Sequence, residues 1–272
     1  MLIITTLMKN NGKLISVFTF SLLLAYSFSV GMCQTTPEKP TEEPREKGSR
    51  PTIVAVIDTG FDFDSTWKDL PISKPRLCKY GHSDFTGMGL KDVHGHGTHI
   101  AGLIGKYAGK SNYCLVIMKY YHLEEKEKID HMQGSLLAFQ KAINIKVDII
   151  NYSGGGIEKS EWECNLMKQA LNMGIVVVTA AGNERSDINE KPYYPAMCDN
   201  RIVAVANVDR QGNYRPSSNY TNAVLLNARE LAKEEGNGVL SLFPNDRTNY
   251  MTGTSQAAAI KTGKIVKERE KQ

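Results

Sequence analysis

Short apolar runs alternate with helical stretches along most of this chain, and that alternation restricts its fold more than any other feature. The apolar runs are Ile53–Ile57, Leu115–Lys119, Val147–Asn151, Ile175–Thr179 and Ile202–Ala206. The stretches between them with a helical pattern are His96–Tyr107, Asp130–Asn144 and Lys159–Met173. Uninterrupted apolar runs are typical of strands buried on both faces. The alternation therefore predicts an α/β fold of three layers, a mostly parallel, doubly wound sheet with helices on both faces.

Reactive side chains in such folds gather beyond the carboxyl ends of the strands, so the polar residues at those ends are the first candidates for a site. Asp58 follows directly after five apolar residues, where a carboxylate is costly to bury unless it is hydrogen-bonded or paired. Taken alone, Asp58 is also compatible with a helix cap or a turn residue.

A glycine-rich turn runs into an apolar helix at His96, and further histidines lie at His94 and His99. Three histidines this close raise the alternative of a metal site. A zinc site on such a helix needs a glutamate beside its first histidine, whereas Gly97 follows His96. We therefore expect no metal and no other cofactor, and we take His96 as a candidate base.

Two more segments end in residues that suit acyl transfer. Asn183 follows a strand that closes in small residues, and its alternative role is an ordinary Gly-Asn turn. Ser255 stands at the start of a helix, where a serine can equally serve as the N-cap. An acid, a histidine, an amide donor and a serine at a helix start are together the parts of an acyl-transfer site.

In chain order, the segments Asp-Thr-Gly at Asp58, His-Gly-Thr-His-Ile-Ala-Gly at His96, Ala-Ala-Gly-Asn ending at Asn183 and Gly-Thr-Ser ending at Ser255 resemble the subtilisin-like serine proteases. The order Asp, His, Ser is that of subtilisin itself. The similarity covers about residues 50–263. It implies a secreted serine endopeptidase in which His96 takes the proton of Ser255 and Asp58 orients the imidazole. Asn183 and the Ser255 backbone N–H would then bind the oxyanion of an intermediate on the way to the acyl-enzyme.

The resemblance also implies where a polypeptide substrate lies. An extended substrate strand would pair with the chain near Ser153, because main-chain pairing holds a peptide in register. The walls of the primary specificity pocket would be Ser153, Gly154, Gly155, Ala180, Ala181 and Gly182.

The cysteines after residue 50 are Cys78, Cys114, Cys164 and Cys198, which by number alone leave open three pairings or four free thiols. The resemblance implies the pairs Cys78–Cys114 and Cys164–Cys198. It also implies a cis peptide bond at Tyr194–Pro195.

The N-terminus has the composition of a targeting segment. Residues 1–33 combine two lysines with an uncharged apolar core and predict a signal peptide, so we expect a secreted or periplasmic protein with no stable membrane insertion after cleavage. A signal anchor and a lipoprotein attached at Cys33 are the weaker alternatives. Residues 34–50 are polar and proline-rich and predict a flexible linker. The net charge of +4 leaves no basic face that suggests nucleic acid.

The peptidase domain predicted at residues 51–272 departs from the family pattern in several places. Ala259 stands where the family has a proline after the serine, and residues 228–235 are charged and helix-prone where an Ala-Pro-Gly turn is usual. No calcium-binding loop is found, and only 17 residues follow Ser255, which makes the domain short at its C-terminus. These departures keep a non-catalytic, subtilase-like peptide-binding protein as the alternative function. The short stretch before residue 51 has no room for the folded prodomain that often assists family members, so either the domain folds unaided or a separate chaperone or inhibitor chain is a partner.

Overall fold

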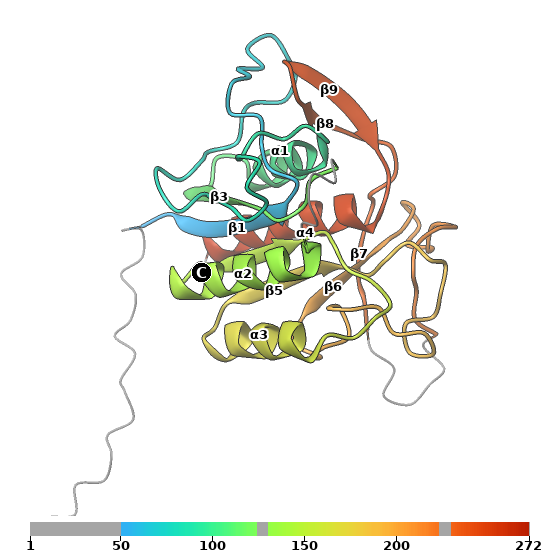
Figure 1. The fold of residues 1–272 in the computed structure, drawn as a ribbon. Coiled ribbons are helices and arrows are strands. Elements are labelled where there is room, and N and C mark those ends of the chain that lie inside the picture. The colour runs from blue at the N-terminus through green and yellow to red at the C-terminus, as the bar shows by residue number, and fades with distance from the viewer. Residues whose placement is uncertain (1–49, 124–129, 223–229, 272) are drawn as a thin grey trace, which may run out of the picture. The chain divides into compact units, whose positions relative to one another are not determined.

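The computed structural model describes residues 50–123, 130–222 and 230–271, and a seven-stranded sheet forms the centre of this part of the chain (Figure 1). The strands of this sheet are β1 (Thr52–Asp58), β2 (Ser83–Asp84), β3 (Tyr113–Lys119), β4 (Ile149–Tyr152), β5 (Val176–Ala180), β6 (Val203–Asn207) and β7 (Ala232–Glu234). They lie in the order β2-β3-β1-β4-β5-β6-β7, and each pair is parallel. The predicted doubly wound parallel sheet is confirmed.

Helices cover both faces of the sheet and complete three layers (Figure 1). They are α1 (His96–Ala108), α2 (His131–Asn144), α3 (Glu161–Asn172) and α4 (Thr254–Arg269). On β1, Val54 and Val56 pack into one core with α1 and α4, whereas Ala55 and Ile57 pack into the other with α2 and α3. Because side chains alternate across a strand, an uninterrupted apolar run supplies both cores at once.

A separate antiparallel hairpin, β8 (Val239–Phe243) and β9 (Arg247–Met251), packs against α1. The Nε2 atom of His99 lies 3.1 Å from the carbonyl oxygens of both Val239 and Asn249, so its N–H donates to the hairpin. The Ser241 hydroxyl donates back to the His99 carbonyl at 2.7 Å. Burial lowers the pKa of His99 to about 4, so this imidazole is neutral and links the hairpin to α1.

The structure differs from the sequence-based expectation in the described part of the segment 228–235, which is residues 230–235. The helix-prone composition there is overridden, because Ala232–Glu234 forms the edge strand β7 beside β6. Glu234 is buried, and its carboxylate accepts a hydrogen bond from Lys264 of α4 at 2.5 Å. Strand pairing and this ion pair outweigh the weak helix propensity of the segment.

Both implied disulfides, Cys78–Cys114 and Cys164–Cys198, are present, and the Tyr194–Pro195 bond is cis. None of the helices in the described ranges has both the length and the hydrophobicity needed to cross a bilayer. The predicted signal peptide at residues 1–33, its cleavage and Cys33 lie outside the described residues, as does the predicted linker up to residue 49.

Candidate active site

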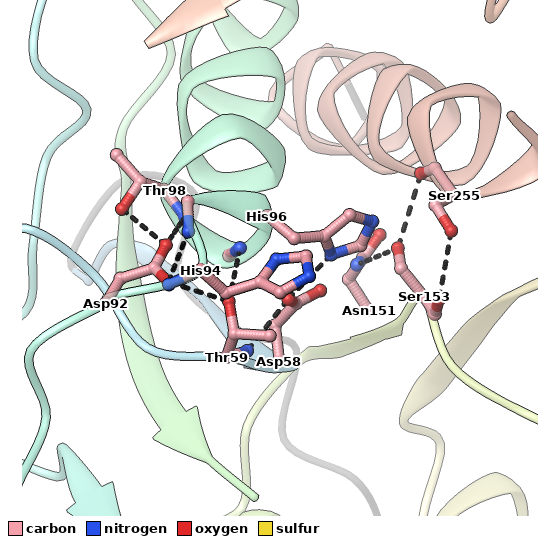
Figure 2. A network of polar contacts seen from close by, with 11 residues as sticks. Asp58, Thr59, Asp92, His94, His96, Thr98, Asn151, Ser153 and Ser255 are labelled. Carbon is pink, nitrogen blue, oxygen red and sulfur yellow. Dashed lines mark hydrogen bonds and ion pairs between the residues drawn. The ribbon is translucent and has the colours of Figure 1, made fainter. Parts of the chain in front are cut away.

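Asp58 and His96 are hydrogen-bonded to each other at the carboxyl end of the sheet. Asp58 is the last residue of β1 and is 4% exposed, and the Nδ1–H of His96 donates to its Oδ1 at 2.7 Å (Figure 2). The same oxygen accepts the Thr59 N–H at 2.8 Å. Burial lowers the pKa of His96, but the charge and hydrogen bond of Asp58, helped by Asp92, outweigh burial and raise it above its ordinary value. With Nδ1 committed to Asp58, Nε2 of the neutral ring is the basic atom.

The first turn of α1 is fixed to β1 by Asp92, a residue that the sequence analysis did not assign to the site. Asp92 is 1% exposed and accepts hydrogen bonds from Thr59, Thr98 and the backbone N–H groups of His94 and Gly95 at 2.7–3.1 Å (Figure 2). Asp92 thus satisfies N–H groups at a helix start that has no side-chain N-cap bond of its own. An aspartate in the turn before a helix is the signal that could have found it.

Ser255 lies in the first turn of α4, across from the Asp58–His96 pair (Figure 2). Its hydroxyl donates to the Ser153 carbonyl at 3.0 Å, and the Ser153 hydroxyl donates to the Ser255 carbonyl at 3.3 Å. Asn151 holds this arrangement, since its Nδ2 donates to the Ser153 hydroxyl at 3.1 Å and its Oδ1 accepts from Thr262 at 2.8 Å. The N-cap of α4 is Gly253, so Ser255 is not the cap residue that its sequence position also allowed.

Asn183 is exposed beyond the end of β5, and its amide is oriented by α4. The Thr254 N–H donates to Asn183 Oδ1 at 3.0 Å, and the Thr254 hydroxyl lies 3.3 Å from the same oxygen. Because Oδ1 is bound to the helix start, the Nδ2 group is left to donate to a ligand. Thr254 is a second positioning residue that the sequence analysis did not single out, although it immediately precedes Ser255.

The residues predicted to bind substrate lie on the two segments that flank this site. Ser153 and Gly154 are partly exposed and Gly155 is exposed, whereas Ala180, Ala181 and Gly182 are buried at the end of β5. Gly154 has a steric reason to be glycine, because a Cβ there would collide with the Tyr120 hydroxyl and the Tyr152 ring. The pocket walls remain a prediction.

The histidines near Asp92 do not converge as metal ligands. His99 is bound to the β8–β9 hairpin, and the His94 and His96 rings are 6.1 Å apart. Among the described residues, no three histidine, cysteine, aspartate or glutamate side chains come together in a way that could hold a metal ion.

The model of the subtilase family, Peptidase_S8, matches residues 49–271 of the chain. The chain belongs to the subtilase family. It is 31% identical over 227 residues to the major intracellular serine protease of Bacillus subtilis (strain 168), a match that covers 78% of this chain. It is also 31% identical over 228 residues to the intracellular serine protease of Paenibacillus polymyxa, again over 78% of this chain.

These alignments cover 66% and 64% of the two relatives, so the chain spans just under two thirds of the length of each of them. The crystal structure of a lanthipeptide protease has the same fold, with a TM-score of 0.66 at 20% identity over 81% of this subtilase and 74% of that chain. The prediction of a secreted or periplasmic protein is wrong, because two relatives that are each 31% identical to this subtilase are intracellular serine proteases.

Proposed function

We propose that this subtilase is a serine endopeptidase of polypeptide substrates, with Asp58, His96 and Ser255 as its catalytic residues in a domain at residues 51–272. One observation carries the proposal: a buried carboxylate holds Nδ1 of an imidazole at 2.7 Å, and a serine hydroxyl lies across from that imidazole at a helix start (Figure 2). The family membership of the chain supports the same chemistry.

Catalysis begins when the Ser255 hydroxyl turns from the Ser153 carbonyl toward Nε2 of His96. Catalytic hydrogen bonds often form fully only when substrate is bound, so the resting contact at 3.0 Å is compatible with this step. His96 takes the proton as Ser255 Oγ attacks the scissile carbonyl carbon, and Asp58 stabilises the imidazolium. The tetrahedral intermediate then collapses, the amine leaves with the proton from His96, and Ser255 retains the acyl group. Water hydrolyses this ester by the same two steps, with His96 again as base and then acid.

The negative oxygen of each tetrahedral intermediate needs donors that are already in place. Asn183 Nδ2 supplies one, because Thr254 holds the other end of its amide. The Ser255 N–H supplies a second, since N–H groups in the first helical turn have no partner within the helix and carry the positive end of its dipole. We assign peptide pairing and the primary pocket to the Ser153–Gly155 and Ala180–Gly182 segments.

Labelling with a serine-directed fluorophosphonate tests the proposal. The reagent should add once to the wild-type protein, as measured by intact mass, and Ser255→Ala should remain unlabelled. The variant should also lose hydrolysis of a quenched fluorescent peptide by several orders of magnitude. Ser73→Ala, which removes an exposed hydroxyl outside the proposed site, is the matched control and should still be labelled.

Two results would contradict the assignment. Equal labelling of wild type and Ser255→Ala would place the nucleophile elsewhere. A folded wild-type protein that is not labelled but binds extended peptides would identify a non-catalytic peptide-binding protein instead.

A further inference from the structure

A cavity of about 460 Å³ opens beside the proposed peptide-pairing segment and is not used by the proposed chemistry. Its walls come from the residues just after β3, the first turns of α2, the end of β4, the segment between β4 and α3, the first turn of α3 and the loop at Tyr194. Aromatic rings and small residues form most of the lining, among them Tyr120, Tyr152, Gly155 and Gly156.

Glu163 is the unusual member of this lining. It is 2% exposed, and burial raises its pKa to about 7. Among the described residues, no group donates a hydrogen bond to its carboxylate, and no lysine or arginine of the described ranges lines the cavity. An ionised carboxylate in such a place is strongly destabilised unless a cation joins it.

The local sequence offers Glu163 a structural role that it does not perform. Ser160 caps α3, and its hydroxyl accepts the Glu163 N–H at 3.3 Å. In a complete capping box, the glutamate three residues after the cap binds back to the N–H of the cap residue. Here the carboxylate lines the cavity instead, so the capping motif does not explain a buried acid at this position.

The position of the cavity relates it to a bound peptide. Gly155 and Gly156 line it, and they follow Ser153, which contacts Ser255. A strand advances about 3.3 Å per residue and points alternate side chains to the same face. A peptide paired with residues 153–156 would therefore present to the cavity a side chain about two to four residues from its scissile bond.

We propose that Glu163 makes this cavity a subsite for a lysine or arginine side chain of the substrate. The inference rests on the proposed function, since it uses the peptide-pairing role of residues 153–156. The methylene stem of the basic side chain would lie along the faces of Tyr120 and Tyr152, and its charged end would reach the Glu163 carboxylate. The proposed subsite thus defines the substrate class as peptides with a basic residue close to the cleavage site.

A positional peptide set tests this inference in the full chain. The peptides differ only in carrying lysine, arginine or norleucine at one of the four positions on either side of the scissile bond. For wild type, one position should show a kcat/KM at least tenfold higher with lysine or arginine than with norleucine. Glu163→Gln should reduce that ratio to near one, whereas Glu161→Gln, an exposed glutamate on the first turn of the same helix, should preserve it.

The wild-type scan keeps the inference falsifiable even if Glu163→Gln fails to fold. Efficient cleavage with no preference for a basic residue at any of these positions would overturn the subsite and leave the peptidase assignment intact. Calorimetric binding of the same peptides to Ser255→Ala tests the subsite independently of hydrolysis. Preferential binding of basic peptides that Glu163→Gln abolishes would support the subsite even if the wild-type protein hydrolysed none of them.

Discussion

At the Asp58–His96 pair, two opposing effects determine when the imidazole can act as a base. Burial disfavours the imidazolium, whereas the adjacent carboxylate favours it and wins, so the pKa of His96 lies above its ordinary value of 6.5. Since a base must be unprotonated to accept the serine proton, a raised pKa delays activity to higher pH. The Asp58 carboxylate therefore orients the imidazole and also moves the pH range in which His96 can act as a base to higher pH.

The acid limb of the pH profile checks this balance. We expect kcat/KM of the wild type to rise with a midpoint above pH 6.5, because kcat/KM reports the free enzyme. Asp58→Asn should move the midpoint downward and lower kcat by about 10⁴-fold, the loss typical when the orienting acid is replaced by its amide. A wild-type midpoint below pH 6.5 would mean that burial dominates, or that another group is the base.

At the scale of elements, the site depends on how closely α1 approaches the end of β1. Gly97, the second residue of α1, has no room for a side chain, because a Cβ there would collide with the Gly60 carbonyl oxygen. The Gly97 N–H also donates to the Thr59 hydroxyl at 2.8 Å. This close contact brings His96 within hydrogen-bonding distance of Asp58.

Gly97→Ala should therefore affect activity as well as stability. Displacing α1 from β1 should cost about 1–3 kcal/mol of unfolding free energy, as for other overpacked sites. It should also lower kcat at least tenfold, because small misplacements of reacting groups are expensive. Lys106→Ala, an exposed change on the same helix, is the control for general effects on α1 and should leave kcat near the wild-type value. Unchanged kcat in a destabilised Gly97→Ala protein would refute the positioning argument.

Among the secondary-structure elements, the sequence predicts the buried strands better than the elements that are held by distant residues. The ends of buried strands such as β1 and β5 were predictable within one or two residues, because an uninterrupted apolar run must be buried on both of its faces. The hairpin and β7 were not, because their residues are held by partners far along the chain, such as His99 for the hairpin and Lys264 for Glu234.

The four segments that carry the family resemblance identified Asp58 and His96, which the structure brings together. Asp92 and Thr254 were missed, since a residue that positions another leaves only a weak local pattern.

At the scale of the whole described domain, Asp148 connects the beginning of the chain's fold to its last helix. Its carboxylate accepts hydrogen bonds from Arg50 at 2.8 and 2.9 Å, from the Ile53 N–H at 2.9 Å and from Arg269 at 3.3 Å. The side chain of Asp148 is 5% exposed. One buried carboxylate thus joins Arg50, 98 residues before it in the sequence, to Arg269, 121 residues after it.

The charge of Asp148 should make the domain sensitive to acid. Burial raises its pKa, but the hydrogen bonds and charges of Arg50 and Arg269, with the Ile53 N–H, more than compensate and lower it below 3.8. A carboxyl with a lowered folded-state pKa stabilises the fold above its unfolded pKa, and this contribution is lost as pH falls through the folded value. Asp148→Asn should therefore lower the free energy of unfolding by about 1.5–3 kcal/mol at pH 7, the range for hydrogen bonds to charged groups. The difference in free energy of unfolding between wild type and Asp148→Asn should shrink as the pH falls below about 4.

Urea unfolding of wild type and Asp148→Asn between pH 3 and pH 7 measures whether their free energies of unfolding converge in acid. Glu268→Gln, which changes an exposed acid near the end of α4, is the control and should show no such pH-dependent difference from wild type. Parallel pH curves for wild type and Asp148→Asn would show that the carboxylate does not connect the two ends energetically. Convergence in acid would show that the ends of the domain are stabilised together, by a residue far from the proposed nucleophile. Loss of activity on acidification would then have two separable causes: protonation of His96, with a midpoint above pH 6.5, and release of Arg50 and Arg269 at far lower pH.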